Sequence, residues 1–190
     1  MKKVFVIYTL LCAMSVSAFS KSKNDKEFIV KAGIQPQSIV SAYSKKLNTS
    51  LGFSGGFEYF QYFGNIFALG GGAIYDSPRT FQDKNYSGNL SFFPLYAGLK
   101  VRTPLHGLDN NYMFFSGRLG YSALITTKDI EWKSSVGGLY YGVGLGISIN
   151  VLVIEVIYAI SNFTYQTASN SKNDDGTYKT ITFYVGFKFE

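Results

Sequence analysis

The chain has 190 residues, a formal charge of +6 and a single cysteine. Its length suits one domain, and a lone cysteine excludes an internal disulfide framework and a cysteine-based metal site. The basic residues form no run, which argues against nucleic-acid binding and favours a solvated surface, with attraction to anionic lipid head groups as the alternative.

The beginning of the chain has the pattern of a secretory signal peptide. Two lysines precede an apolar stretch over residues 4–14, and small residues follow it. The apolar stretch is too short for a transmembrane helix, which takes about 20 residues. We therefore expect residues 1–20 to be a signal cleaved after Ala18 or Ser20. Residues 21–190 then form one exported domain with 16 basic and 12 acidic residues, a charge of about +4.

Apolar and polar side chains alternate in eight later stretches. Because successive side chains of a strand point to opposite faces, this alternation predicts strands with one apolar face and one polar or small face. In residues 138–149, for example, Leu139 and Tyr141 share one face, and Gly142 and Gly144 share the other. The predicted strands cover residues 27–35, 49–60, 66–75, 89–102, 112–125, 138–149, 152–163 and 178–190.

The predicted connections alternate in length. Shorter connections cover residues 61–65, 103–111 and 150–151. The longer ones are rich in Ser, Asn, Asp, Lys and Gly, and they cover residues 36–48, 76–88, 126–137 and 166–177. Long loops at one end and short turns at the other are typical of bacterial outer-membrane barrels.

The polar face of these strands distinguishes a membrane barrel from a soluble sandwich. A sandwich would turn that face to water and should carry many charges there. Here the face is mainly Gly, Ser, Ala, Tyr and Thr with isolated charges, which suits the narrow interior of an eight-stranded barrel. The sequence predicts an all-β fold, an eight-stranded antiparallel up-and-down transmembrane β-barrel, with a soluble barrel or sandwich as the alternative.

The last strand is expected to close this barrel. Its odd-numbered residues from Ile181 to Phe189 are all apolar, so we expect them to face lipid. Its edge should pair with the strand around residues 28–34, because only closure removes both exposed edges.

Two stretches resemble a known family, the small outer-membrane β-barrels of the OmpA/OmpX-like superfamily. Residues 93–100 (FPLYAGLK) resemble a central strand of these proteins. The last strand is similar to the C-terminal assembly signal, with Thr182, Phe187 and Phe189 at its polar, hydrophobic and terminal aromatic positions. Tyr184 stands where a glycine is usual, and Glu190 follows the terminal aromatic residue. The resemblance implies a Gram-negative outer membrane, with its lipids and the barrel-insertion machinery as partners.

Seven charged residues fall on the face assigned to the lumen. They are Lys31, Glu58, Lys100, Arg102, Arg118, Glu155 and Lys188. Such charges could line an ion path, but in a barrel of eight strands a salt-bridged plug is favoured. Since desolvated charges need partners, Glu58 is expected to pair with Lys31, and Glu155 with Arg118 or Lys100.

No pattern predicts catalysis or a cofactor. The single histidine, His106, falls in a short turn, so a Ser-His hydrolase is disfavoured and we expect no catalytic residue. Residues 174–176 (DDG) could touch calcium weakly but are more typical of a loop tip, and no metal site is predicted. Gly142, Gly144 and Gly146 lie at every second residue of a strand, so they are expected to make room for Arg118 or Tyr140 rather than to bind phosphate.

The expected function is that of a monomeric outer-membrane barrel with a structural or surface-interaction, adhesion-like role. The alternatives are a barrel-embedded lipid-modifying enzyme and a narrow, porin-like pore or small-ligand transporter. An extracellular ligand would contact the four long loops, and the candidate contact residues are Lys128, Asp129, Glu131, Trp132, Lys172 and Asp174.

Overall fold

The computed structural model describes most of the chain beyond the expected signal. The described residues are 26–42, 45–83, 88–105, 111–126, 132–167 and 173–190. The expected signal, His106 and four of the candidate loop contacts (Lys128, Asp129, Glu131 and Lys172) lie outside them. No helix among the described residues is long and apolar enough to cross a membrane.

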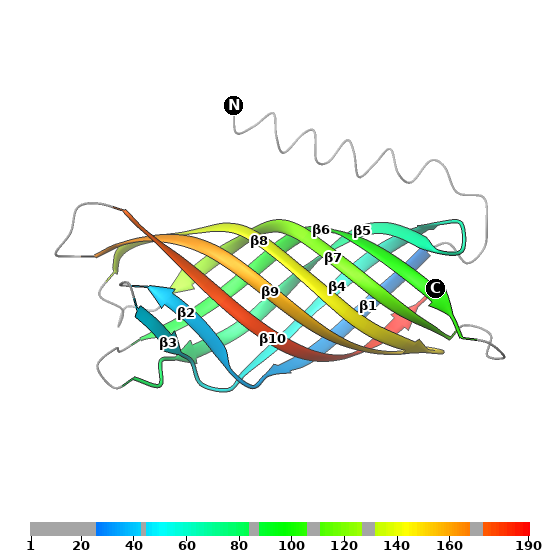
Figure 1. Ribbon diagram of the computed structural model, residues 1–190, viewed down its shortest axis with the longest axis horizontal. Coiled ribbons are helices and arrows are strands. Elements are labelled where there is room, and N and C mark those ends of the chain that lie inside the picture. The colour runs from blue at the N-terminus through cyan, green and yellow to red at the C-terminus, as the bar shows by residue number, and fades with distance from the viewer. Residues whose placement is uncertain (1–25, 43–44, 84–87, 106–110, 127–131, 168–172) are drawn as a thin grey trace, which may run out of the picture.

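The described residues form ten strands in one antiparallel sheet. The strands are β1 (Lys26–Gln35), β2 (Ser38–Ala42), β3 (Lys45–Asn48), β4 (Gly52–Phe63), β5 (Phe67–Thr80), β6 (Asn89–Pro104), β7 (Tyr112–Thr126), β8 (Trp132–Ile149), β9 (Leu152–Thr167) and β10 (Asp174–Phe189). Eight of them, β1 and β4 to β10, form a closed ring of neighbours, so the predicted fold is confirmed (Figure 1).

The seam of the ring lies between β1 and β10. Phe28 lies opposite Phe189, and Ile34 lies opposite Phe183, so the predicted closure is confirmed. The barrel has a terminus end, which carries the start of β1 and the end of β10, and a distal end, which carries β2 and β3 (Figure 1). At the terminus end, Asn150 adopts φ 52°, which Asn tolerates, and the hairpin keeps Ile149 opposite Leu152, as predicted.

The prediction of a loop over residues 36–48 is wrong in part, because this segment contains β2 and β3. Pro36 interrupts the first strand, and β2 resumes pairing with the same partner, β10, after one extra residue: Ile34 is opposite Phe183, but Ser38 is opposite Thr180. A single inserted residue shifts the alternation by one, which hides the continuation from a sequence pattern. The chain then turns back through β3, which pairs with β2.

The other three predicted long loops are shorter than expected because their flanking strands continue into them. The strands β8, β9 and β10 contain 18, 16 and 16 residues. A membrane span takes about 9–11 tilted residues, so these strands continue by about five to nine residues beyond one span. In this distal part some outward residues are polar, as with Lys179, and the alternation that predicts strands is weaker.

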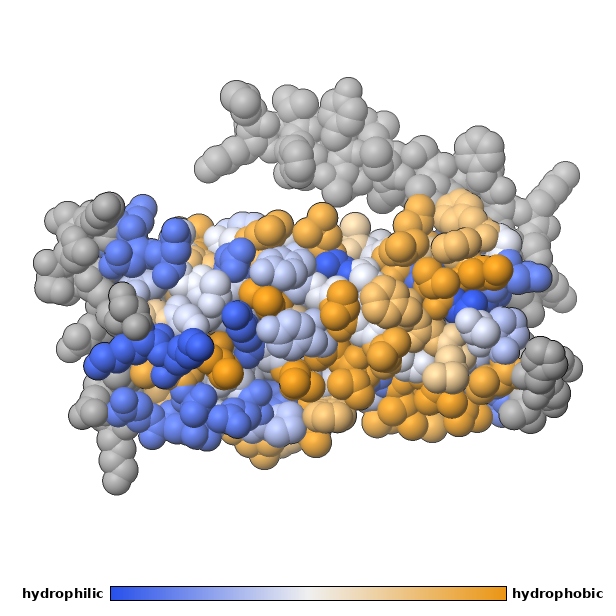
Figure 2. All heavy atoms as spheres, viewed as in Figure 1, coloured by the Kyte–Doolittle hydropathy of each residue, from blue (hydrophilic) through white to orange (hydrophobic). Residues whose placement is uncertain are grey.

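Side chains on the outer wall and in the lumen differ sharply. On β10, the outward residues from Ile181 to Phe189 are between 46% and 58% exposed, whereas Thr182 and Tyr184 are buried. The exposed apolar side chains gather toward the terminus end, and hydrophilic ones cover the distal end near β2 and β3 (Figure 2). An apolar belt of this kind around a closed barrel is suited to lipid, so the structure is a transmembrane barrel.

Candidate functional site

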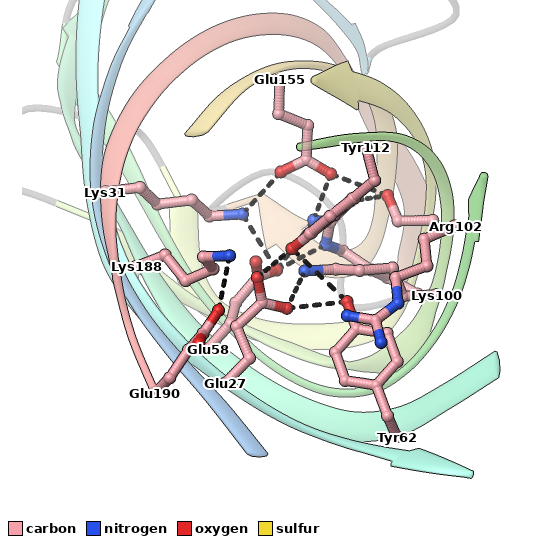
Figure 3. Close-up of polar contacts among 12 residues, drawn as sticks. Glu27, Lys31, Glu58, Tyr62, Lys100, Arg102, Tyr112, Glu155, Lys188 and Glu190 are labelled. Carbon is pink, nitrogen blue, oxygen red and sulfur yellow. Dashed lines mark hydrogen bonds and ion pairs between the residues drawn. The ribbon is translucent and has the colours of Figure 1, made fainter. Parts of the chain in front are cut away.

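The middle of the lumen holds four charged residues that we call the central charge cluster: Lys31, Glu58, Arg118 and Glu155. They come from β1, β4, β7 and β9 and converge inside the barrel (Figure 3). Lys31 Nζ lies 2.9 Å from Glu58 Oε1 and 3.1 Å from Glu155 Oε2. Arg118 Nη2 lies 2.8 Å from Glu58 Oε1 and 2.7 Å from Glu155 Oε1. Each cation therefore contacts both carboxylates.

Hydrogen bonds complete the pairing of this cluster. Tyr96 donates its hydroxyl to Glu58 at 2.6 Å, and Ser116 donates to Glu155 at 2.7 Å. Arg118 donates Nε to Glu58 at 2.9 Å and Nη1 to Ser116 at 2.9 Å. The four charged side chains are at most 1% exposed. Buried charges are stable only with this degree of mutual pairing, so the cluster fills and seals the middle of the lumen.

A second group of polar residues, which we call the terminus-end cluster, is built around Glu27 near the start of β1. Lys100 Nζ lies 2.8 Å from Glu27 Oε2, Tyr62 donates to the same oxygen at 3.0 Å, and Tyr112 donates to the other oxygen. The guanidinium of Arg102 stacks 3.7 Å from the ring centre of Tyr62 (Figure 3). Both oxygens of the Glu27 carboxylate therefore accept bonds from partners inside the lumen.

The structure brings together most of the lumen charges named from the sequence. The expected contact between Glu58 and Lys31 is present, and Glu155 contacts Arg118 rather than Lys100. Two of the seven residues stand apart from the ion pairs of these clusters. Arg102 is half-buried and donates to the backbone oxygen of Asn65, and Lys188 pairs with Glu190 at 2.8 Å.

Glu27 is one of three buried lumen charges, among the described residues, that the sequence pattern missed. It lies at the start of the predicted first strand and has the same parity as Lys31, so alternation alone could have placed it in the lumen. Asp76 and Arg79 were missed for a different reason. Both fall in a predicted loop. Asp76 continues the inward alternation of Ile74 beyond the predicted strand, and an irregularity in the pairing of β5 with β6 between Asp76 and Arg79 turns Arg79 into the barrel.

Gly144 makes room for the central charge cluster, as predicted from its position. A Cβ atom at this residue would lie 2.6 Å from Ser116 Oγ, 2.7 Å from Glu155 Oε1 and 3.0 Å from Arg118 Nη1. Any side chain here would displace the paired charges. The glycine therefore has a packing role within the strand.

The distal part of the lumen is filled by apolar side chains, which we call the distal apolar cluster. Phe92 and Tyr178 stack at its centre with ring centres 4.4 Å apart. The members come from both sides of the barrel and from the β2–β3 hairpin: Val40, Ala42, Leu47, Leu90, Phe92, Phe163, Tyr165 and Tyr178. This packing resembles the core of a soluble protein and closes the distal end of the lumen.

A polar layer separates the central charge cluster from the distal apolar cluster. Gln35 donates to Asp76 at 2.7 Å, and Tyr184 and Ser54 share a hydrogen bond of 2.6 Å. A cavity of about 10 Å³ lies in this layer. Such a cavity has room for about one water molecule.

The residues expected to form a C-terminal assembly signal are divided between the two faces of β10. Thr182 is buried in the lumen, whereas Phe187 and Phe189 are exposed on the lipid-facing wall. Tyr184 fits into the lumen because its cross-strand neighbour Gly33 provides the space: a Cβ there would lie 2.7 Å from the Tyr184 ring.

The described residues contain no group of three or more His, Cys, Asp or Glu side chains that could hold a metal ion. Residues 174–176, expected as a loop tip, form the first residues of β10, and Trp132 begins β8. In the part of the chain that the structure describes, residues 174–176 belong to no such group.

Comparisons with known proteins agree with this architecture. No protein-family model matches the chain, and no curated protein matches it. Among solved structures, the chain is similar to Ail, the attachment invasion locus protein of Yersinia pestis, with a TM-score of 0.51 and 21% identity, covering 87% of this chain and 99% of Ail. It is also similar to Neisserial surface protein A, with a TM-score of 0.53 and 13% identity, covering 85% of this chain and 97% of that protein. The chain has the fold of the small outer-membrane β-barrel proteins.

Proposed function

We propose that this protein is a non-conducting barrel of a bacterial outer membrane with a structural or surface-interaction role. In this proposal, residues 1–20 direct export and are cleaved, both ends of the mature chain lie in the periplasm, and the distal end is extracellular. Phe187 and Phe189 present the assembly signal to the barrel-insertion machinery. The mature protein is a monomer without catalytic residues.

The filled lumen is the observation that carries this proposal. The central charge cluster pairs each buried cation with two carboxylates, and the distal apolar cluster packs across the same lumen beyond it. A channel or transporter needs a continuous path, and an enzyme with its site in the lumen needs a pocket there that admits substrate. Two seals in series and a cavity of about 10 Å³ between them favour neither.

The distal wall supports the surface-interaction part of the proposal. The strands continue beyond the apolar belt, and their outward side chains there are hydrophilic (Figure 2). This arrangement makes a rigid platform for the distal loops outside the lipid. The attachment role in the description of Ail, a protein of the same fold, motivates this half of the proposal.

Planar-bilayer recordings with the refolded protein test the sealed lumen. We expect no single-channel steps, because both seals block the lumen. Regular steps of conductance from the wild-type protein would contradict the proposal and favour the pore.

Loop replacement then separates the two roles. Residues 81–88, 127–131 and 168–173 are replaced one at a time by Gly-Ser segments of equal length, and binding of barrel-bearing cells to host cells and extracellular matrix is measured. A surface-interaction protein loses binding with at least one replacement, whereas the same replacement of residues 105–111 at the terminus end leaves it unchanged. A structural protein shows no loss of binding, but its deletion weakens the outer membrane against detergent.

A further inference from the structure

Arg102, at the terminus end of the lumen, is a cation without a carboxylate partner. Two neighbouring lumen cations are paired. Lys100 lies 2.8 Å from Glu27. Lys188 likewise lies 2.8 Å from Glu190. Among the described residues, no carboxylate lies within ion-pair distance of Arg102, so its positive charge is not balanced by a contact within the barrel.

The guanidinium of Arg102 is nevertheless held in one orientation. It stacks 3.7 Å from the ring centre of Tyr62 and lies 5.3 Å from that of Tyr112 (Figure 3). Its Nε donates to the backbone oxygen of Asn65 at 2.9 Å. The hydroxyl groups of both tyrosines donate to Glu27, which fixes the two rings in turn. A side chain that is already ordered loses little conformational entropy when it binds a ligand.

The two Nη atoms of Arg102 are open to solvent. In the part of the chain that the structure describes, they make no hydrogen bond. Unlike Nε and Nη2 of Arg79, they are not among the buried donors that lack a partner. Arg102 is half-buried, and its neighbour on β7, Phe114, is buried on the lumen side of the wall. The Nη atoms therefore lie at the mouth of the lumen, on the side of the wall away from lipid.

We propose that the Nη1–Nη2 edge of Arg102 is a binding site for a carboxylate group at the mouth of the terminus end. The N–H groups of this edge point in parallel and match the two oxygens of a carboxylate through paired, charge-assisted hydrogen bonds. Carboxylates also balance Lys100 and Lys188, so the ligand supplies the group that Arg102 lacks. The inference goes beyond the proposed function and uses it only to place this mouth in the periplasm. The carboxylate then belongs to a small periplasmic acid or to an acidic residue of a periplasmic peptide.

Titration of the refolded protein in detergent micelles tests the site directly. The Nε–H of Arg102 and its backbone N–H, which donates to Ile66 at 2.8 Å, are followed by NMR. Sodium acetate replaces sodium chloride at constant pH and ionic strength, and we expect saturable shifts of both signals. A capped tripeptide with a central Asp and its Asn counterpart are added to separate samples. Saturation by acetate assigns a small acid, and saturation by the Asp peptide alone assigns a peptide. No saturable shift with either probe, or equal shifts with the Asp and Asn peptides, overturns the proposal.

Variants separate the carboxylate site from a merely structural role. Arg102→Lys keeps the charge but loses the paired donors, so we expect binding, read from the backbone N–H of residue 102, to weaken at least about tenfold. Tyr62→Leu removes the ring that orients the guanidinium and should weaken binding about threefold. Lys26→Gln removes an exposed cation at the same end and serves as the control with unchanged binding. Equal binding by the wild type and Arg102→Lys would refute the site, and the wild-type titration decides the matter if either variant fails to fold.

Discussion

The central charge cluster and the distal apolar cluster lie in one lumen, yet they are built from opposite chemistry. The first seals the barrel with paired ions, and the second seals it with stacked rings and aliphatic side chains. Ion pairs fix one geometry, because a displaced charge is left without a partner in a dry interior. Apolar packing tolerates small changes of shape. The two regions should therefore respond very differently to substitution.

The largest effect is expected from Gly144→Leu. The new side chain would overlap Ser116, Glu155 and Arg118, so the buried charges could not pair and the barrel should fail to fold. Folding into micelles is measured by the heat-dependent mobility of the barrel on gels. Gly117→Leu is the matched control on the outer wall, where a Cβ meets nothing within 4 Å, and it should fold normally. Normal folding of Gly144→Leu would mean that the lumen is not filled.

Glu58→Gln should have the next largest effect. It removes one of two carboxylates shared by Lys31 and Arg118 and leaves two buried cations with Glu155 alone. We expect a loss of about 3–5 kcal/mol in the free energy of unfolding, measured by urea titration in micelles. Glu190→Gln, which breaks the half-exposed pair with Lys188, should cost less than about 1 kcal/mol. Equal losses in the two variants would contradict the central role of the cluster.

Phe92→Leu tests the distal apolar cluster, and its effect should be smaller. The substitution keeps an apolar side chain but removes the stacking with Tyr178, so we expect a loss of about 1–2 kcal/mol. Phe115→Leu makes the same change on the lipid-facing wall, where Phe115 is 47% exposed, and should have little effect. If Phe92→Leu destabilised the barrel as much as Glu58→Gln, the distinction between the two regions would fail.

Tyr184→Phe addresses the polar layer between the clusters and should have the smallest effect. It removes the hydroxyl that shares a hydrogen bond with Ser54, at an expected cost of about 0.5–1 kcal/mol. Tyr158→Phe on the outer wall, where Tyr158 is 43% exposed, is the control and should leave stability unchanged. A loss well above that of Phe92→Leu would show that the polar layer, rather than either cluster, controls the stability of the lumen.

Alternation predicted the parts of the barrel in contact with lipid, and it failed beyond them. Between Ile181 and Phe189 every outward residue is apolar, so the strand, its faces and its role at the seam follow from residue spacing. Beyond that belt the outward and inward faces of the strands no longer differ clearly in polarity. Alternation therefore did not predict the strands β2 and β3, the distal part of β8 or the inward positions of Asp76 and Arg79.

The amino-acid sequence by itself determined which side chains face lipid and which face the lumen, because a strand repeats every two residues and lipid tolerates only apolar groups. It also placed Glu58 with Lys31, since charges in a narrow lumen need partners on neighbouring strands. Only the tertiary structure decided which cation meets which carboxylate across the barrel. Glu155 pairs with Arg118, Lys100 pairs with Glu27, and Arg79 keeps two unpaired nitrogen atoms, because strand register and local bulges set those distances and residue order does not.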